Sequence, residues 1–235
     1  MKPKIIIEKI EEAKSNQSSS FTLNFRKIRA IPPEISELKM IKSLNISGNK
    51  LTSLPKEIFD LINLEKLEVN GNLLKSIPSD IERLTNLKEL NLSYNSISSL
   101  PGELYSLTNL KKLFLNVNDL TIISNGIGKL NNLVELNIGY NKLEILPDEI
   151  GFLKNLEELI LLNNKFTIFP KSIGRLKKIK NIEVFGNKFS SIPDEIAIFI
   201  KDNLIQTDMN TDLEVEESFV DQGDLDGLLE LYDDE

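Results

Sequence analysis

The chain has 235 residues, of which 40% are apolar and 27% are charged, and its formal net charge is −8. It contains no cysteine and no histidine. This excludes disulfides, thiolate nucleophiles, thiolate zinc sites, iron–sulfur clusters and imidazole bases or ligands. Neither a GxxxxGK(S/T) phosphate loop nor a GxGxxG motif occurs. Because carboxylate or lysine chemistry would need a positive signal of its own, the sequence predicts no catalytic residues, no cofactor and no metal.

The amino-terminal residues have the pattern of a short amphipathic helix. Residues 4–14 place Ile6, Ile10 and Ala13 on one helical face, so residues 1–17 are predicted to form a capping helix. A helix lying on a membrane surface is the alternative, which the small apolar face and the acidic residues disfavour. The apolar run is too short for a secretory signal, and no stretch approaches the roughly 20 apolar residues that span a bilayer. We therefore expect no membrane span and a cytoplasmic location.

Residues 18–201 consist of eight copies of a 23-residue repeat. Seven asparagines, each 23 residues after the last, mark it: Asn49, Asn72, Asn95, Asn118, Asn141, Asn164 and Asn187. Apolar residues stand five and three positions before each asparagine, and a proline follows six positions after most of them. One copy is summarised as LxxLxLxxNxLxxLPxxIxxLxxL. This pattern resembles the leucine-rich repeat family, in the 23-residue class of intracellular Ras-suppressor and scribble-like proteins and of bacterial repeat arrays.

The physical chemistry of one copy predicts the fold without the family. Leu44 and Ile46 are two residues apart, so a strand points both to the same side, with the polar Asn45 on the other. Such a strand buries its apolar side only by stacking on its neighbours, about 4.8 Å apart. Asn49 is expected to satisfy backbone groups where the chain turns, and Pro55 to begin a short helical turn. The prediction is an α/β solenoid with a curved parallel sheet on the concave face and short helical turns on the convex face.

Two departures from the pattern and two aromatic residues carry expectations of their own. The fifth copy has Ser124 in place of proline and two nearby glycines, so we expect the most flexible convex segment there. Phe59 and Phe152 are expected on the convex surface. A degenerate ninth copy begins at Asp202.

The positions that alternate with the core leucines supply the candidate binding site. In the amino-terminal copies these positions are polar, whereas in the carboxy-terminal copies they turn apolar and aromatic. The predicted partner-binding residues on the concave face are Tyr94, Phe114, Val117, Tyr140, Ile160, Leu162 and Phe185. Contiguous apolar patches with aromatic anchors mark interfaces. The alternatives are scattered apolar surface residues, or a patch that the chain's own tail covers.

Residues 202–235 form a segment of distinct composition, predicted to be a degenerate repeat or carboxy-terminal cap followed by an acidic tail. They contain thirteen acidic and no basic residues, so residues 1–201 carry a net charge of +5. Leu225, Leu228, Leu229 and Tyr232 have helical spacing, which leaves a capping helix, a docking motif and solvated disorder open. We expect the tail to fold back toward residues 165–188. This stretch contains seven basic residues and one acidic residue.

Two further sites are disfavoured. Residues 222–233 faintly resemble an EF-hand calcium loop, but the first ligand position is Gln222 and no paired loop exists. Nucleic acid or anionic lipid could use the basic stretch at residues 165–188, but the net charge argues against nucleic acid as the main partner.

The expected function is that of a non-catalytic protein–protein interaction module or scaffold that binds a protein partner on its concave face. The resemblance implies a small GTPase or another signalling complex as that partner. The alternative is an acidic-tailed regulator that binds or inhibits a basic protein through residues 202–235. An enzymatic function would need a further domain, which the 34 residues after the last full repeat are too few to form.

Overall fold

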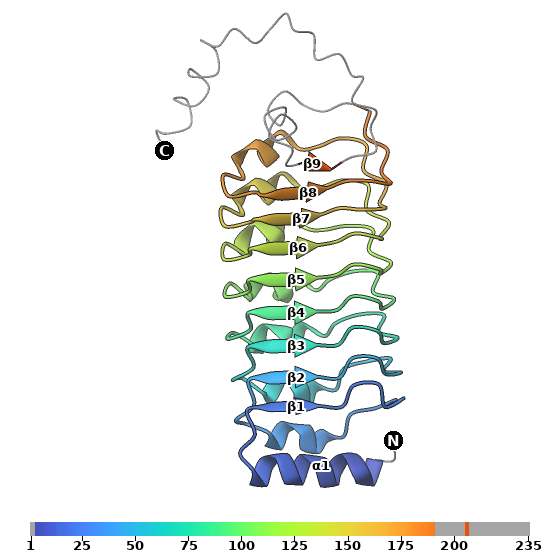
Figure 1. Ribbon diagram of the computed structural model, residues 1–235, viewed down its shortest axis with the longest axis vertical. Helices are drawn as coiled ribbons and strands as arrows, with labels where there is room; N and C mark the ends of the chain where they lie inside the picture. The colour runs from blue at the N-terminus through green and yellow to red at the C-terminus, as the bar shows by residue number, and fades with distance from the viewer. Residues whose placement is uncertain (1–2, 191–204, 207–235) are drawn as a thin grey trace, which may run out of the picture.

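The computed structural model describes residues 3–190 and 205–206, and shows an elongated stack of similar coils (Figure 1). Within these residues nine parallel strands form a single sheet, in which the strand order follows the chain order. The strands are β1 (Ser20–Thr22), β2 (Ser43–Asn45), β3 (Lys66–Glu68), β4 (Glu89–Asn91), β5 (Lys112–Phe114), β6 (Glu135–Asn137), β7 (Glu158–Ile160), β8 (Asn181–Glu183) and β9 (Ile205–Gln206).

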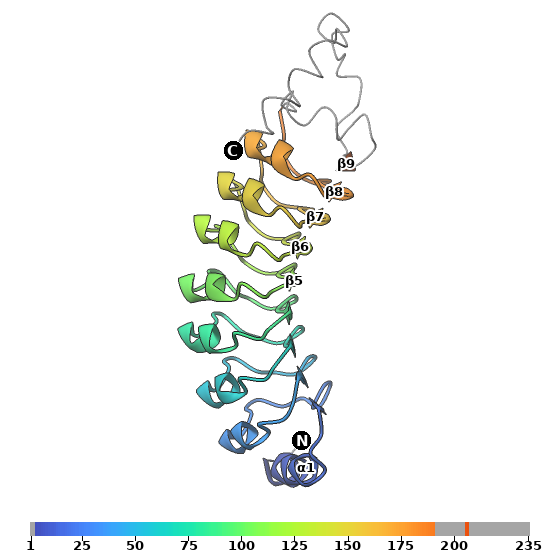
Figure 2. The same cartoon turned by 90° about the vertical axis from the view of Figure 1, so that its left-hand side faces the viewer.

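Each coil corresponds to one copy of the repeat. Leu44 lies in register with Leu67, and Leu67 with Leu90, so a step of 23 residues in the sequence is one strand-to-strand step in space. Residues at the same repeat position therefore form columns along the stack. The predicted fold class is confirmed: the sheet lines one side, and 3-10 helices line the other (Figure 2). These helices are Pro33–Glu37, Lys56–Asp60, Ser79–Arg83, Gly102–Ser106, Asn125–Lys129, Asp148–Phe152 and Lys171–Arg175.

A single apolar core runs the length of the stack between the sheet and the 3-10 helices. Leu44 and Ile46 are fully buried, as the repeat pattern predicts, and their counterparts in later coils are buried as well. At the amino-terminal end, α1 (Pro3–Ser15) covers the first coil with Ile6, Ile10 and Ala13 buried. Lys14 of this helix makes a 2.8 Å ion pair with Glu37.

The asparagines that mark the repeat form a buried hydrogen-bonding ladder. The Asn49 Oδ1 accepts hydrogen bonds from the backbone N–H groups of Arg26 and Ile28, both at 3.0 Å. Its Nδ2 donates to the carbonyl oxygens of Leu23 and Ile46, both at 2.9 Å. The side chain thus joins its own coil to the preceding one, which confirms the predicted role of this position.

A second asparagine ladder, which was not predicted from the sequence, lies on the opposite, exposed edge of the stack. The Asn63 Nδ2 donates to the Lys39 carbonyl at 2.8 Å, and Asn132 donates to Thr108 at 2.9 Å. Asn86, Asn109 and Asn155 make the equivalent contact. Their 23-residue spacing was present in the sequence as the only signal that could have revealed them.

One expectation for the convex side needs correction. Phe59 is fully buried, whereas Phe152 is 48% exposed. The two residues occupy different positions of the 3-10 helix, and the position of Phe59 is also buried where it holds Tyr105. The fifth coil forms the same 3-10 helix as its neighbours, and the Ser124 hydroxyl caps it by accepting from the Gly126 N–H at 3.3 Å. A Cβ added at Gly126 would lie 2.5 Å from the Tyr105 ring, so this glycine is a packing requirement.

Several predictions concern residues that the structure does not describe. They include the tail stripe of Leu225, Leu228, Leu229 and Tyr232, the EF-hand-like run and the degenerate ninth copy apart from Ile205 and Gln206.

Candidate functional site on the concave face

Four columns of side chains make up the concave face. The entry column consists of Ser20, Ser43, Lys66, Glu89, Lys112, Glu135, Glu158 and Asn181. The strand column consists of Thr22, Asn45, Glu68, Asn91, Phe114, Asn137, Ile160 and Glu183. The exit column, two residues further, consists of Asn24, Ser47, Asn70, Ser93, Asn116, Gly139, Leu162 and Phe185. The turn column follows directly with Phe25, Gly48, Gly71, Tyr94, Val117, Tyr140, Asn163 and Gly186.

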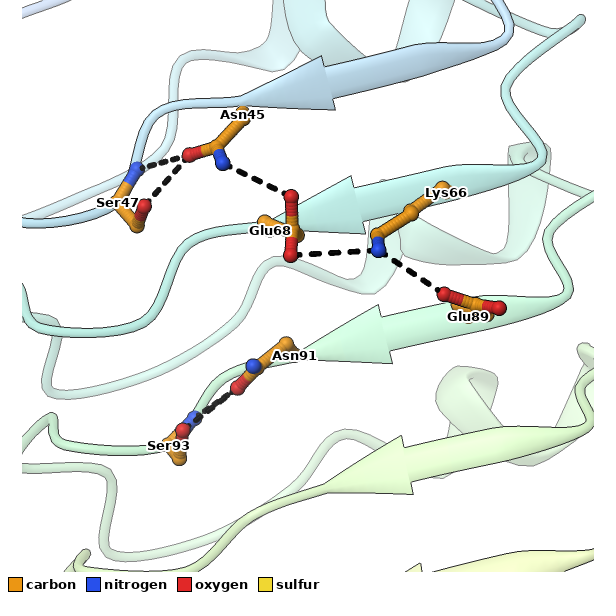
Figure 3. A network of polar contacts seen from close by, with 7 residues as sticks. All are labelled: Asn45, Ser47, Lys66, Glu68, Glu89, Asn91 and Ser93. Carbon is orange, nitrogen blue, oxygen red and sulfur yellow. Dashed lines mark hydrogen bonds and ion pairs between the residues drawn. The ribbon is translucent and has the colours of Figure 1, made fainter. Parts of the chain in front are cut away.

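The amino-terminal half of this face is a polar network whose groups satisfy one another (Figure 3). The Lys66 ammonium lies 3.4 Å from the Glu68 carboxylate and 3.2 Å from that of Glu89. The Asn45 Nδ2 donates to Glu68 at 2.8 Å, and its Oδ1 accepts from the Ser47 backbone N–H at 3.0 Å. A partner would have to break these contacts before it made its own, which lowers the net gain from binding here.

Asn91 and Ser93 make the same contact two coils further along the stack as Asn45 and Ser47 do. The Asn91 Oδ1 accepts from the backbone N–H of Ser93 at 3.1 Å and from its hydroxyl at 2.6 Å (Figure 3). Beyond this pair the concave columns change character, because the next strand residue along the stack is Phe114.

The carboxy-terminal half gathers the predicted site residues. Phe114 and Ile160 share the strand column, with Asn137 in register between them, and both are half-buried. Leu162, half-buried, and Phe185, 39% exposed, are successive members of the exit column. The seven predicted residues thus occupy neighbouring positions on five successive coils.

The turn column holds bulky residues in a backbone conformation that favours glycine. Tyr94, Val117 and Tyr140 have φ angles of 54°, 57° and 55°, whereas the equivalent Gly48 and Gly186 adopt 65° and 72° without a side chain. A left-handed conformation costs a residue with a Cβ about 1–2 kcal/mol. Burial does not offset this cost at the two tyrosines, since Tyr94 is 59% and Tyr140 is 52% exposed.

Replacing Tyr140 by glycine is therefore expected to leave stability nearly unchanged. Relief of the left-handed strain favours the variant, and the greater entropy of glycine in the unfolded chain opposes it by about 0.4–1 kcal/mol. We expect the free energy of unfolding, measured by urea denaturation, to change by less than about 1 kcal/mol. Asn163→Gly is the matched control, because asparagine tolerates this conformation. A loss above about 2 kcal/mol at Tyr140 would show that its ring stabilises the fold.

Carboxylates border the apolar half. The Lys112 ammonium pairs with Glu135 at 2.7 Å. The pKa of Lys112 is raised, chiefly by its hydrogen bond to Glu135 and, after a smaller opposing effect of burial, by the charges of Glu135, Glu89 and Glu158. Glu158 lies in register with Glu135 and Asn181, and it forms no ion pair among the described residues. The concave columns thus carry more negative than positive charge.

Glu65 lies on the entry flank, between the ammonium groups of Lys42 at 2.9 Å and Lys88 at 2.6 Å. Together with Asn63 and Asn86 these residues line a shallow depression. Hydrogen bonds from Lys88 and Lys42, against a smaller effect of burial, lower the pKa of Glu65 from 4.5 to about 2. A carboxyl group that stays ionised in this way does not act as a general acid or base near neutral pH.

An NMR titration of the Glu65 carboxyl group should therefore have its midpoint at about 2, with a shift toward 4.5 in the Lys88→Met variant. Because the folded pKa is the lower one, the stabilising contribution is present above the unfolded value of about 4.5. It is lost as the pH falls toward the folded value. A midpoint near 4.5 in the wild-type chain would contradict the paired geometry.

Across residues 3–190 and 205–206, no group of three or more acidic side chains has an arrangement suited to a metal ion. The same part of the chain has no helix with the length and apolar composition needed to cross a bilayer.

Comparison with known proteins identifies the same repeat. Residues 21–121 match a family model described as a leucine-rich repeat region, and residues 132–153 match the Leucine Rich Repeat model. No match is found among curated proteins.

Many solved structures are similar. A leucine-rich repeat protein of Leptospira interrogans is 30% identical, with a TM-score of 0.50, over 84% of this chain and 62% of that one. The leucine-rich repeat ectodomain of the Arabidopsis thaliana receptor kinase GASSHO1/SCHENGEN3, in complex with CASPARIAN STRIP INTEGRITY FACTOR 2, is 31% identical, with a TM-score of 0.69, over 79% and 23%. Internalin C2 of Listeria monocytogenes is 23% identical, with a TM-score of 0.73, over 86% and 92%.

The chain spans less than two thirds of the length of the first two of these proteins. The repeat period, the in-register stack of parallel strands and the matching family models agree with one another. They support a protein–protein interaction module, and the chain belongs to the leucine-rich repeat family.

Proposed function

We propose that the carboxy-terminal half of the concave face binds a protein partner through a segment that carries apolar side chains and lysine or arginine. The observation that carries this proposal is the turn column. Two tyrosines that are more than half exposed are kept in a strained left-handed conformation where other coils use glycine. Strain that the fold does not need is a feature of binding sites.

The side chains next to the turn column supply the exposed apolar surface and the carboxylates that a binding hot spot requires. Phe114, Ile160 and Leu162 are only half-buried, and Phe185 is 39% exposed, so a partner would remove further apolar surface from water. Glu158 and Glu183 offer carboxylates that form no ion pair among the described residues. A partner with basic groups beside its apolar anchors would pair with them and associate faster.

The receptor ectodomain similar to this chain was solved in complex with CASPARIAN STRIP INTEGRITY FACTOR 2, and another similar structure is that of a plant peptide hormone receptor in complex with RGF2. The peptide hormone receptor supports a polypeptide as the ligand class. The resemblance to the Ras-suppressor class makes small GTPases and their cytoplasmic signalling complexes the first partners to screen. In such a complex the chain would act as a scaffold without catalytic activity of its own.

Binding should depend on Phe185. Truncation to alanine is expected to weaken the affinity by about 1–3 kcal/mol, because aromatic anchors carry a large share of interface energy. Phe152→Ala is the matched control, since this phenylalanine is also exposed but lies on the convex side. The affinity would be measured by titration calorimetry with a captured partner, and the fold of each variant checked by its urea midpoint.

A variant in which Phe114, Ile160, Leu162 and Phe185 are all replaced by alanine tests the location of the binding surface. Unchanged affinity in this variant would place the partner on another face. If binding is lost only when residues 202–235 are deleted, the acidic-tailed regulator is the correct function instead.

A further inference from the structure

An exposed apolar column lies on the flank of the stack, outside the concave face. Ile122, Ile145 and Ile168 occupy the same repeat position in three successive coils and are 62%, 68% and 57% exposed. We call them the isoleucine column. The first four coils place Ala30, Ser53, Ser76 and Ser99 at this position. Because the fold accepts serine there, packing does not explain the isoleucines.

The isoleucine column runs between the buried asparagine ladder and the 3-10 helices. Ile145, for example, follows Asn141 by four residues and precedes Pro147 by two. Lys142, Lys165 and Lys188 form a parallel column of ammonium groups on the same flank.

Two of these lysines have partners within the stack. Lys142 lies 2.6 Å from Asp119, and Lys165 lies 3.7 Å from Glu144. No ion pair of Lys188 occurs within the described residues. The flank therefore combines apolar surface with positive charge that is only partly neutralised.

We infer that residues 224–233 of this chain, which lie outside the described residues, cover the isoleucine column as an amphipathic helix. A second copy of the chain fits less well. Three side chains offer far less than the ~800 Å² per partner that a stable interface buries. An intramolecular partner needs no such area, because its effective concentration is in the millimolar range.

The spacing of the apolar residues in the tail matches the spacing of the isoleucine column. Leu225, Leu228, Leu229 and Tyr232 recur at one helical turn, which is about 5.4 Å. Successive coils lie about 4.8 Å apart at the sheet and further apart toward the convex side, so one helical turn matches one coil. Two helical turns, from Leu225 to Tyr232, would therefore place three apolar groups opposite three isoleucines.

The connecting segment has a suitable length. Eighteen residues lie between Gln206 at the end of β9 and Leu225, which gives a root-mean-square span of about 23 Å for a flexible chain. The coil of Ile122 lies four strand spacings from β9, which is about 19 Å. Effective concentration is highest when the two lengths are similar.

Charge favours docking of the tail on the flank over docking on the concave face. Residues 224–233 carry four acidic and no basic residues. They would be repelled by Glu158 and Glu183 on the concave face and attracted by Lys165 and Lys188 on the flank. The tail would therefore cover the flank and leave the proposed binding surface open.

Amide hydrogen exchange of the whole chain tests this inference. The test variant carries Ile122→Ser, Ile145→Ser and Ile168→Ser, which copies the residues of earlier coils. The control carries Met40→Ser and Ile62→Ser, which removes exposed apolar residues, 63% and 53% exposed, from another edge. We expect residues 225–232 to be protected in the wild type and the control, and this protection to be lost in the test variant.

The other outcomes overturn the inference. Random-coil exchange of residues 225–232 in the wild type would show that they do not dock. Protection that persists in the test variant would place them on another surface. Protection of the coils around Ile145 that rises with protein concentration and survives deletion of residues 207–235 would identify a second copy as the occupant. None of these measurements depends on the concave partner.

Discussion

Leu136→Ala is expected to lower the free energy of unfolding by about 2–5 kcal/mol, through lost burial and the cavity that remains. Leu136 is fully buried in β6, in register with Leu113 on one side and Leu159 on the other. Neighbouring coils hold its surroundings on both sides, so the cavity collapses poorly. Urea denaturation of the two proteins measures the difference.

Leu73→Ala is the matched control, because the same atoms are removed from a side chain that is 50% exposed. Its expected effect is within about 0.5 kcal/mol. Equal losses for the two variants would contradict the assignment of core and surface positions within the repeat.

Asn141→Ala is expected to cost about 2–5 kcal/mol, because it leaves several buried backbone groups without a partner, each worth about 1–3 kcal/mol. The Asn141 Oδ1 accepts from the Leu120 N–H at 3.0 Å. Its Nδ2 donates to the carbonyls of Leu115 and Ile138, both at 3.0 Å. Since these groups lie in two coils, the loss should weaken the contact between the coils.

The second asparagine ladder supplies the control for this experiment. Asn132 is exposed and makes one hydrogen bond, to the Thr108 carbonyl at 2.9 Å. Water can replace this bond, so Asn132→Ala should cost less than about 1 kcal/mol. A similar melting temperature for the Asn141 and Asn132 variants would show that the buried ladder does not stabilise the stack.

The fold could be predicted from the sequence because the repeat period and the coil are the same length. Once Leu44 and Asn49 were assigned to core and turn, the 23-residue step placed every equivalent residue. The prediction that Phe59 lies on the convex surface was wrong. The burial of Phe59 depends on the direction of its side chain within a five-residue helix, which the repeat pattern does not specify. The second asparagine ladder was not predicted because no alternation of apolar and polar residues surrounds the edge position of Asn132.

The candidate site was predicted as a set of positions, but its physical character was not. The sequence placed Tyr140 at the end of a strand, while the left-handed backbone that makes it costly is a property of the folded turn. The saturation of Asn45 and Glu68 by each other also depends on contacts between coils, which the sequence does not display. The exposed isoleucines at Ile122 and Ile145 lie outside the strand positions on which the sequence analysis concentrated.

Hydroxyl-radical footprinting of the chain alone and with its partner tests the central claim most directly, because oxidation reports the exposure of individual aromatic side chains. Tyr94, Tyr140 and Phe185 are exposed on the concave face, and Phe152 is exposed on the convex side. A partner bound as proposed should reduce oxidation of the first three and leave Phe152 unchanged. Protection of Phe152 with undiminished oxidation of Tyr94, Tyr140 and Phe185 would contradict binding on the concave face.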